Sequence, residues 1–437
     1  MIRDRDALGG SPARDLALDC VEAGVRAADP ERAVREALDV EGDRLSIGDA
    51  TYDLAAYDDV IVVGAGKATV GLARGLEARL GDRLSGGIVV SDAPADLDRI
   101  EVLVGDHPVP SERGVAAAER VRTFVELADE RTLLFAAFTG GGSALFTHPA
   151  ADLSLADLRA TTDALLRSGA SIDAVNAVRK HLSAVKGGRL AAAADGATVV
   201  GLLVSDVVGD DPSVIASGPV APDPTTYRDA LDAVASLSVP DAVHEHLERG
   251  AAGEYPETPA PGDAAFDRVR THVLASGETA LAAASEVAER EGYHATVLDP
   301  AVTGEARESA ADHLDAARRV LAGEAPVTPP AVLLTGGELT VTVDGDGEGG
   351  PNQEFCLAAA LDCPGGVTVA AVDTDGRDGS TDAAGAIVDA DTVTDRAAAE
   401  AALAANDAFS FLDARDALVR TGRTGTNVND LRVVVVW

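Results

Sequence analysis

Short apolar runs alternate with helix-like segments along most of the chain. Residues 59–63, 133–138 and 198–204 are dominated by Val, Leu, Ile, Ala and Phe, and each run leads into a glycine-rich or polar turn. Strands that are apolar on both faces are typical of parallel sheets covered by helices. The alternation therefore predicts an α/β fold with a Rossmann-like, mainly parallel sheet that carries helices on both faces.

A proline-rich stretch at residues 253–263 interrupts this pattern and has the composition of a linker. Further strand-like runs follow it, at 295–298, 331–334, 367–372 and 431–436. We therefore expect two α/β domains, residues 1–255 and 264–437, with the Rossmann-like sheet in the first.

Acidic residues outnumber basic residues about two to one. The chain has 73 Asp and Glu against 36 Lys and Arg, a formal net charge of −37 that is spread along its whole length. Such a field repels phosphate backbones, so no nucleic-acid partner is expected. The even spread suits a halophilic protein in high salt, where the Debye length is about 3 Å or less. No apolar segment predicts a signal peptide or a membrane span, so we expect a cytoplasmic protein without a membrane partner.

Lysine is nearly absent from the chain. Lys67, Lys180 and Lys186 are its three lysines, and each lies beside a glycine-rich or His/Arg-rich segment. A surface that has replaced lysine by arginine should keep it where a mobile ammonium group is needed. The three positions are therefore candidates for function.

The segment Gly64-Ala65-Gly66-Lys67 follows a strand-like run and opens a helix-like segment. Glycine lets the backbone approach an anion at a helix N-terminus, and Lys67 adds a positive charge. Thr69 stands where a dinucleotide fingerprint has its third glycine, and no Walker A motif occurs. The alternatives are a phosphate-binding loop made by Gly64, Gly66 and Lys67, or a plain turn with a solvated lysine.

A second glycine turn follows the run at 133–138. The N–H groups of Gly140, Gly141, Gly142 and Ser143 could form a nest for a carboxylate or a phosphate. Ser143 as a nucleophile is the alternative, but the sequence lacks the G-x-S-x-G elbow, and we favour anion binding.

Residues 176–189 form a basic island in this acidic chain. Arg179, Lys180 and Lys186 favour contact with phosphate, and positions 179, 182 and 186 could share one helical face. Pairing with the acidic surface is the alternative.

Three aspartates follow the run at 198–204. Asp206 and Asp211, with Asp210 between them, could hold Mg²⁺, which takes one or two carboxylates together with phosphate oxygens. One of the carboxylates could also accept the proton of a substrate hydroxyl.

His107, in the first half, is either a catalytic base or a packed loop residue.

Polar loops in the second half supply further candidates for binding substrate. The loop residues predicted to contact substrate or phosphate are Asn352, Glu354, Asp375, Arg377, Thr426 and Asn427.

Together these segments resemble the glycerate 2-kinase family whose second half is called a MOFRL domain. The resemblance covers residues 13 to 437 nearly throughout. The motifs that carry it are, in chain order, GAGKA at Gly64, GDHPVP at Gly105, TGGGSAL at Thr139, NAVRKHLSAVKGGRLA at Asn176, SDVVGDDPSVIASGP at Ser205, GEARE at Gly304, TGGELTVTV at Thr335, NQE at Asn352, DTDGRDGSTDAAGA at Asp373 and TGTNVNDL at Thr424.

The resemblance implies transfer of a phosphoryl group from ATP to the 2-hydroxyl of D-glycerate, with a divalent metal such as Mg²⁺. It also implies two α/β domains with the active site in the cleft between them, and it places the family's catalytic lysine on Lys67. The family's second basic residue falls on Pro351 here, a departure. Its role is therefore either dispensable or supplied by Arg377, Arg179 or another residue.

Phosphoryl transfer depends on positioning and on charge neutralisation. Our hypothesis has Lys67 stabilise the transferring group, Asp206 and Asp211 hold Mg²⁺, and Arg179 with the Gly140–Ser143 turn hold the substrate carboxylate. The rival functions are an NAD(P)H-dependent hydroxypyruvate reductase and a non-catalytic sensor of sugar acids or nucleotides. The expected partners are D-glycerate and ATP, and the assembly could be a homodimer.

Overall fold

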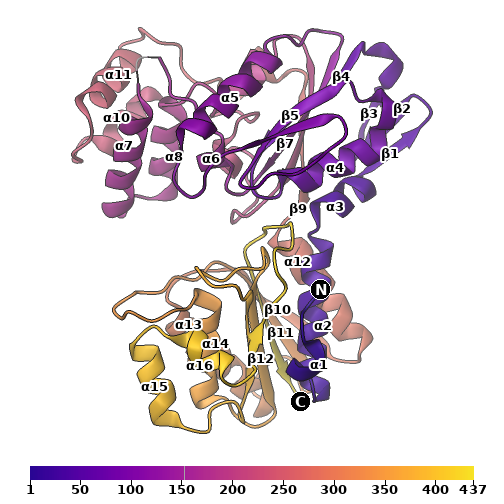
Figure 1. The fold of residues 1–437 in the computed structure, drawn as a ribbon, viewed down its shortest axis with the longest axis vertical. Helices are drawn as coiled ribbons and strands as arrows, with labels where there is room; N and C mark the ends of the chain where they lie inside the picture. The colour runs from indigo at the N-terminus through magenta and orange to yellow at the C-terminus, as the bar shows by residue number, and fades with distance from the viewer. Residues whose placement is uncertain (152) are drawn as a thin grey trace. The chain divides into compact units, whose positions relative to one another are not determined.

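The computed structural model describes residues 1–151 and 153–437, and they form two compact units. The parallel-sheet unit is Pro30–Leu274, and the mixed-sheet unit combines Met1–Asp29 with Ala275–Trp437 (Figure 1). This division differs from the predicted ranges 1–255 and 264–437. Its physical reason is that the first helices pack onto the sheet built by the last third of the chain.

The parallel-sheet unit has a six-stranded sheet of order β6-β5-β4-β7-β8-β9. The pairs β6/β5, β5/β4, β4/β7 and β7/β8 are all parallel, which confirms the predicted mainly parallel sheet. The strands are β4 (Asp59–Ala65), β5 (Gly86–Ser91), β6 (Ile100–Val104), β7 (Thr132–Thr139), β8 (Thr198–Val204) and β9 (Val269–Ala275).

Helices flank this sheet (Figure 1). The side chains of Ile61 and Val63 from β4 belong to one core cluster with Ala117 and Val121 of α5 (Glu112–Val125). The helix α4 (Thr69–Leu80) contacts β4, β5 and β7. Each strand is buried along most of its length because helices remove it from water, which explains its continuous apolar sequence.

A helical layer extends the unit beyond the sheet and has its own core, with Leu165, Val178, Tyr227 and Leu247 among its members. Its helices are α7 (Leu155–Arg167), α8 (Ile172–His181), α10 (Tyr227–Val234) and α11 (Asp241–Ala251). The other elements of the unit are α3 (Pro30–Ala37), α6 (Gly142–Leu145), α9 (Arg189–Ala193), the short 3-10 helices η1 (Leu54–Ala56), η2 (Gly81–Arg83), η3 (Ile215–Ser217) and η4 (Ala264–Phe266), and an antiparallel meander of β1 (Leu38–Glu41), β2 (Arg44–Ile47) and β3 (Ala50–Asp53).

The mixed-sheet unit has a sheet of order β10-β11-β15-β12-β13-β14. Here β10 and β11 are parallel and the remaining pairs are antiparallel, whereas the repeated strand pattern had suggested parallel pairing. The terminal strand β15 accounts for two of the antiparallel pairs, because it enters between β11 and β12 and runs against both, and the chain reverses direction again between β12 and β13 and between β13 and β14. The strands are β10 (His294–Val302), β11 (Ala331–Gly337), β12 (Val367–Asp373), β13 (Gly385–Asp389), β14 (Leu418–Val419) and β15 (Asp430–Val436).

Alternate residues of β15 supply the two cores of this unit. Val434 and Val436 face a cluster with Phe355 of α14 (Pro351–Asp362), while Val433 faces one with Leu18 of α2 (Pro12–Ala27). The other helices are α1 (Arg5–Leu8), α12 (Gly277–Arg290), α13 (Ala306–Leu321), α15 (Arg396–Ala404) and α16 (Ala408–Asp413). Within the described ranges, no helix is both long enough and apolar enough to span a membrane.

Candidate active site

Two predicted glycine turns meet at one edge of the parallel sheet. The strands β4 and β7 are parallel neighbours, so their carboxyl ends, and the turns that follow them, lie together. The backbone N–H of Lys67 donates to the carbonyl oxygen of Gly140 at 2.9 Å, and that of Ala68 donates to Thr139 Oγ1 at 3.1 Å. The structure therefore brings Lys67 to the second glycine turn.

Gly64 and Gly66 serve this close approach of the two strands. A Cβ on Gly64 would lie 2.0 Å from the carbonyl oxygen of Ala137, and one on Gly66 would lie 2.1 Å from Thr139 Oγ1. The N–H of Gly66 is already donated to the carbonyl oxygen of Val90. The structure thus gives both glycines a packing role, and their predicted contact with phosphate stays a prediction.

Gly141 lies where Lys67 and His107 come together. Its φ of 79° is in the left-handed region that glycine adopts freely, and a Cβ there would meet Lys67 Cγ at 3.0 Å and His107 Cδ2 at 3.2 Å. Gly142 lies close to Ala216, and a Cβ on Gly142 would be only 2.6 Å from the Cβ of Ala216. A side chain at either position would displace its neighbours.

A cavity of about 700 Å³ opens beside this turn, and all of its lining residues belong to the parallel-sheet unit. Its polar lining includes His107, Ser143, Arg179, Ser183 and Lys186. Three predicted site residues, Ser143, Arg179 and Lys186, therefore share one cavity with Gly141.

Lys186 is buried at the wall of this cavity, with 3% of its surface exposed. Its ammonium group donates to the carbonyl oxygen of Phe146. Burial, together with the positive charge of Arg179, lowers the pKa of Lys186 to about 7. Desolvation also lowers the pKa of the half-buried Arg179. The guanidinium group of Arg179 and the protonated form of Lys186, both partly desolvated, form a favourable site for an anion, and a bound anion would in turn favour that protonated form.

The predicted helical face shared by residues 179, 182 and 186 does not exist, because α8 ends at His181. Lys186 reaches the cavity from the turns after the helix. Helical spacing is therefore not what brings Arg179 and Lys186 together.

The hydroxyl group of Ser143 lies 2.8 Å from that of Ser217, which in turn donates to Asn176 Oδ1 at 3.3 Å. Ser217 follows Ala216 in a stretch of left-handed backbone, with φ values of 51° and 62°. Ser143 thus lies against another hydroxyl group, whereas an activated nucleophile requires a general base. This geometry favours the binding role of Ser143.

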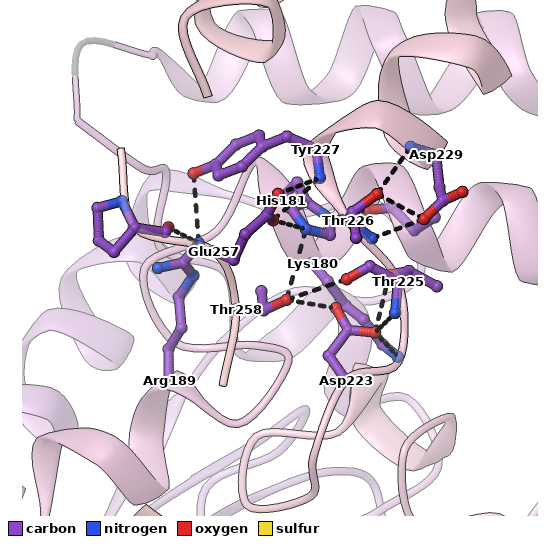
Figure 2. Close-up of polar contacts among 12 residues, drawn as sticks. Lys180, His181, Arg189, Asp223, Thr225, Thr226, Tyr227, Asp229, Glu257 and Thr258 are labelled. Atoms are coloured by element: carbon purple, nitrogen blue, oxygen red, sulfur yellow. Dashed lines mark hydrogen bonds and ion pairs between the residues drawn. The ribbon is translucent and has the colours of Figure 1, made fainter. Parts of the chain in front are cut away.

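Lys180 has a different place from Lys186. Its ammonium group pairs with Asp223 at 3.1 Å, and both side chains are buried. The Asp223 carboxylate also accepts hydrogen bonds from Thr225 and Thr258, next to the contact between His181 and Glu257 (Figure 2). Burial alone would raise the pKa of Asp223, but the charge of Lys180 and the Thr225 hydrogen bonds hold it below its usual value. The structure thus places Lys180 in a buried ion pair, and its predicted phosphate contact stays a prediction.

The predicted metal ligands follow β8. Asp206 is half-buried and Asp211 is exposed, and Asp211 Oδ1 accepts the backbone N–H of Ser213 at 2.8 Å. Within residues 1–151 and 153–437 no group of three or more His, Cys, Asp or Glu side chains forms a metal cluster. The predicted role of Asp206 and Asp211 as Mg²⁺ ligands stays a prediction.

The predicted residues of the second half lie in the mixed-sheet unit, and several are occupied by interior contacts. The amide group of Asn352 donates to Asp430 at 2.7 Å, and the carboxylate of Glu354 pairs with Arg307 at 2.6 Å. The hydroxyl group of Thr426 donates to the carbonyl oxygen of Ala28 at 2.6 Å. These three side chains stabilise the fold of their unit.

Asp375 and Arg377 are adjacent in a loop after β12. Asp375 Oδ1 accepts the backbone N–H of Arg377 at 2.8 Å, and Arg377 Nε donates to the carbonyl oxygen of Thr381 at 3.4 Å. Asn427 is buried. Their predicted contacts with substrate stay predictions.

Sequence reasoning assigned no role to Asp378 or Arg432. Asp378 accepts the backbone N–H groups of Asn352 and Gln353, and Arg432 is fully buried and paired with Asp430. The signal for Arg432 was visible, since it is a charged residue inside the apolar run 431–436. A buried charge in a central strand requires a partner.

Two family models match the chain. The model described as a domain of unknown function (DUF4147) matches residues 16–250, and the MOFRL family model matches residues 331–430. Together they cover both halves of the sequence.

Named relatives align along most of the chain. It is 37% identical over 433 residues to a glycerate 2-kinase of Pyrococcus horikoshii, with 97% of each protein covered. It is 36% identical to a D-glycerate 2-kinase of Thermotoga maritima, with 97% of this chain and 98% of the relative covered. A putative hydroxypyruvate reductase of Agrobacterium vitis is 42% identical, with 86% of this chain and 87% of the relative covered.

The fold is also similar to solved structures. The crystal structure of a glycerate kinase from Thermotoga maritima superposes with a TM-score of 0.84 at 35% identity, covering 97% of this chain and 99% of that one. A Pyrococcus horikoshii protein gives the same TM-score at 37% identity, covering 98% and 99%.

Proposed function

The chain belongs to the glycerate 2-kinase family with a C-terminal MOFRL region, and from that premise we propose that it phosphorylates the 2-hydroxyl of D-glycerate. ATP is the phosphoryl donor, Mg²⁺ is the metal, and 2-phosphoglycerate and ADP are the products. One observation carries the proposal within this chain. The Lys67 loop is hydrogen-bonded to the Gly140 turn beside a cavity that holds Arg179 and the buried Lys186.

The residues around this turn have complementary roles in the proposed reaction. In the transition state, negative charge spreads over the oxygens of the transferring phosphoryl group, and fixed cations stabilise it. Lys67 stabilises that group, and Arg179 and Lys186 bind anionic groups of the substrates. Asp206 and Asp211 hold the metal, which neutralises phosphate charge when bound.

A substrate hydroxyl must lose its proton as the phosphoryl group arrives. Asp206, half-buried after β8, and His107, beside Gly141, are the candidates for accepting it. Asp206→Asn and His107→Gln are assayed separately across pH. Because Asp206 also holds the metal, the drop in kcat alone does not identify the base, and the base is the residue whose replacement removes the acidic limb of the kcat–pH profile.

The test of the function uses the full chain in molar KCl with ATP, Mg²⁺ and D-glycerate. We expect 2-phosphoglycerate, identified against 3-phosphoglycerate by phosphorus NMR. The same preparation is incubated with NADH and hydroxypyruvate, the substrates of the rival reductase. Oxidation of NADH without formation of a phosphoglycerate would refute the kinase proposal.

A further inference from the structure

The cavity beside Gly141 has an apolar wall that a small hydroxy acid would not need. The helices α7 and α8 supply Leu158, Leu165, Leu166, Val178 and Leu182 to it. Glycerate has three carbons and three polar groups, one carboxylate and two hydroxyls, so it gains little from contact with leucine. A volume of about 700 Å³ lies instead within the range of sites for much larger ligands.

The remaining wall is polar and basic. It includes Gly141 and Ser143 at α6, with Arg179 and the buried Lys186 nearby. Lys186 is fixed to this wall, because its ammonium group donates to the carbonyl oxygen of Phe146, the residue that ends α6. The ligand that fits both walls has a flat apolar part and several negative charges.

Two apolar side chains at this cavity are exposed to solvent. Leu166 exposes 63% and Val109 exposes 58% of its surface, although both line the cavity. A ligand placed between them would remove this area from water, which is favourable in proportion to the apolar surface covered.

We propose that this cavity is the nucleotide subsite, with the adenine and ribose of ATP against Leu158, Leu166 and Val109 and the phosphates at the wall of Arg179 and Lys186. This inference rests on the proposed kinase function. The contact between Gly141 and Lys67 Cγ would lead the terminal phosphate out of the cavity to Lys67. Arg179 then binds nucleotide phosphate, and not the glycerate carboxylate as the sequence analysis predicted.

Thr162 provides a direct test, because it lines the cavity from α7 and is only partly buried. The variant Thr162→Trp should fill the apolar part. Calorimetric titration of the full chain with Mg²⁺ and AMP-PNP, a non-hydrolysable ATP analogue, should then show a Kd at least tenfold higher than in the wild type.

A matched pair of leucines controls for a general effect of mutation. Leu166 lines the cavity, whereas Leu127 follows α5, is 77% exposed and does not line it. We expect Leu166→Ser to raise the Kd of AMP-PNP three- to tenfold and Leu127→Ser to leave it unchanged. Because Leu166 is exposed, its replacement should not disturb folding. Leu166→Ser therefore still tests the subsite if circular dichroism shows that Thr162→Trp fails to fold.

Kinetics separate this inference from the proposed function. Thr162→Trp should raise the KM for ATP and leave the KM for D-glycerate nearly constant. An increase in the glycerate KM alone, or an unchanged AMP-PNP Kd in a folded variant, would overturn the nucleotide subsite while the kinase proposal stands. If the wild type binds AMP-PNP, loses it in Thr162→Trp and yet forms no phosphoglycerate, the subsite is supported and the kinase proposal fails.

Discussion

At the scale of single residues, the three lysines have three different environments. Lys67 is half-buried at the glycine turn, Lys186 is buried at the cavity, and Lys180 is buried against Asp223. The scarcity of lysine marked all three as unusual positions, but it could not show that Lys180 lies in an interior ion pair while Lys186 lines the cavity. The separation depends on where α8 ends and on the distant residue Asp223, and neither is encoded in the local pattern.

Replacing Lys67 tests the proposed catalytic charge. Lys67→Ala should lower kcat about 100- to 1000-fold, because loss of one preorganised transition-state contact has an effect of this size. The thermal midpoint should stay within a few degrees, since the backbone hydrogen bond from Lys67 to Gly140 does not involve the side chain. Near-normal turnover in steady-state kinetics would remove Lys67 from the mechanism.

Lys186 predicts a dependence of stability on pH. Its pKa falls to about 7 in the folded protein, whereas the ordinary lysine value is 10.5. Between pH 7 and pH 10 the unfolded chain therefore binds a proton that the folded chain lacks, and by linkage the free energy of unfolding rises with pH. The cost of burying the Lys186 amine is therefore absent above pH 10.5, grows as the pH falls toward 7, and is complete below pH 7.

The variant Lys186→Met isolates this effect, because it removes the titrating group and keeps most of the volume. The wild type should lose stability relative to Lys186→Met as the pH falls from 10 to 7, by on the order of 1 kcal/mol per pH unit. Urea unfolding at pH 7, 8.5 and 10 measures the difference. A constant difference across this window would show that Lys186 does not change its charge there.

At the scale of elements, Asp378 caps a helix from a distant loop. Its two carboxylate oxygens accept the N–H groups of Asn352 at 3.0 Å and Gln353 at 2.8 Å, in the first turn of α14. Helix starts leave such N–H groups unpaired unless a side chain accepts them. Pro351, at the first helical position, needs no acceptor, so this departure from the family's motif suits the start of α14.

Removing this cap should destabilise the mixed-sheet unit. We expect Asp378→Ala to lower the free energy of unfolding by about 2–4 kcal/mol, because two buried N–H groups lose their acceptors. Asp378→Asn should lose less, since its amide oxygen still accepts one hydrogen bond. Burial raises the pKa of Asp378 to about 7, so denaturation is measured at pH 8, where the folded carboxyl group is ionised and both of its oxygens can accept. A loss below about 0.5 kcal/mol in Asp378→Ala would contradict the capping role.

The strand-to-turn pattern predicted most of the parallel-sheet unit, including the meeting of the Lys67 loop with the Gly140 turn. That success has a physical cause, because parallel strands end at one edge and their loops must be neighbours. The pattern could not give the direction of β15, since a strand buried on both faces is equally apolar in either direction. Nor could the pattern show that Gly66 packs against Thr139 and not against a ligand. Glycine is required in either case, because neither close approach leaves room for a Cβ.

At the scale of the whole molecule, the charge predicts a requirement for salt. The net charge of −37 includes many carboxylates in excess of the available arginines, and exposed ion pairs such as Arg120–Glu101 contribute little. Unfolding should therefore become easier as KCl falls from 2 M to 0.05 M, because screening is lost. The control is sucrose added at low KCl, because sucrose is excluded from protein surfaces but does not screen charge. Equal thermal midpoints at both KCl concentrations would contradict a halophilic adaptation.

The division of the chain predicts how its parts fold. The parallel-sheet unit is the continuous segment 30–274, so it should unfold cooperatively when expressed alone. The mixed-sheet unit needs residues 1–29, because Leu16, Leu18 and Val21 of α2 cover one face of its sheet. Each such side chain contributes about 1.5–3 kcal/mol when fully buried, and together they approach the total stability of a typical domain.

Residues 275–437 alone should consequently lack a cooperative thermal transition and bind the dye ANS through the exposed sheet face. Adding a peptide of residues 1–29 should restore the transition, whereas the same peptide with Leu18→Asp and Val21→Asp should not, because the charged side chains cannot enter the core. Calorimetry of the three samples decides the matter. A cooperative transition in 275–437 without the peptide would mean that this sheet is stable with one face uncovered, and α2 would then be an accessory to the unit and not part of its core.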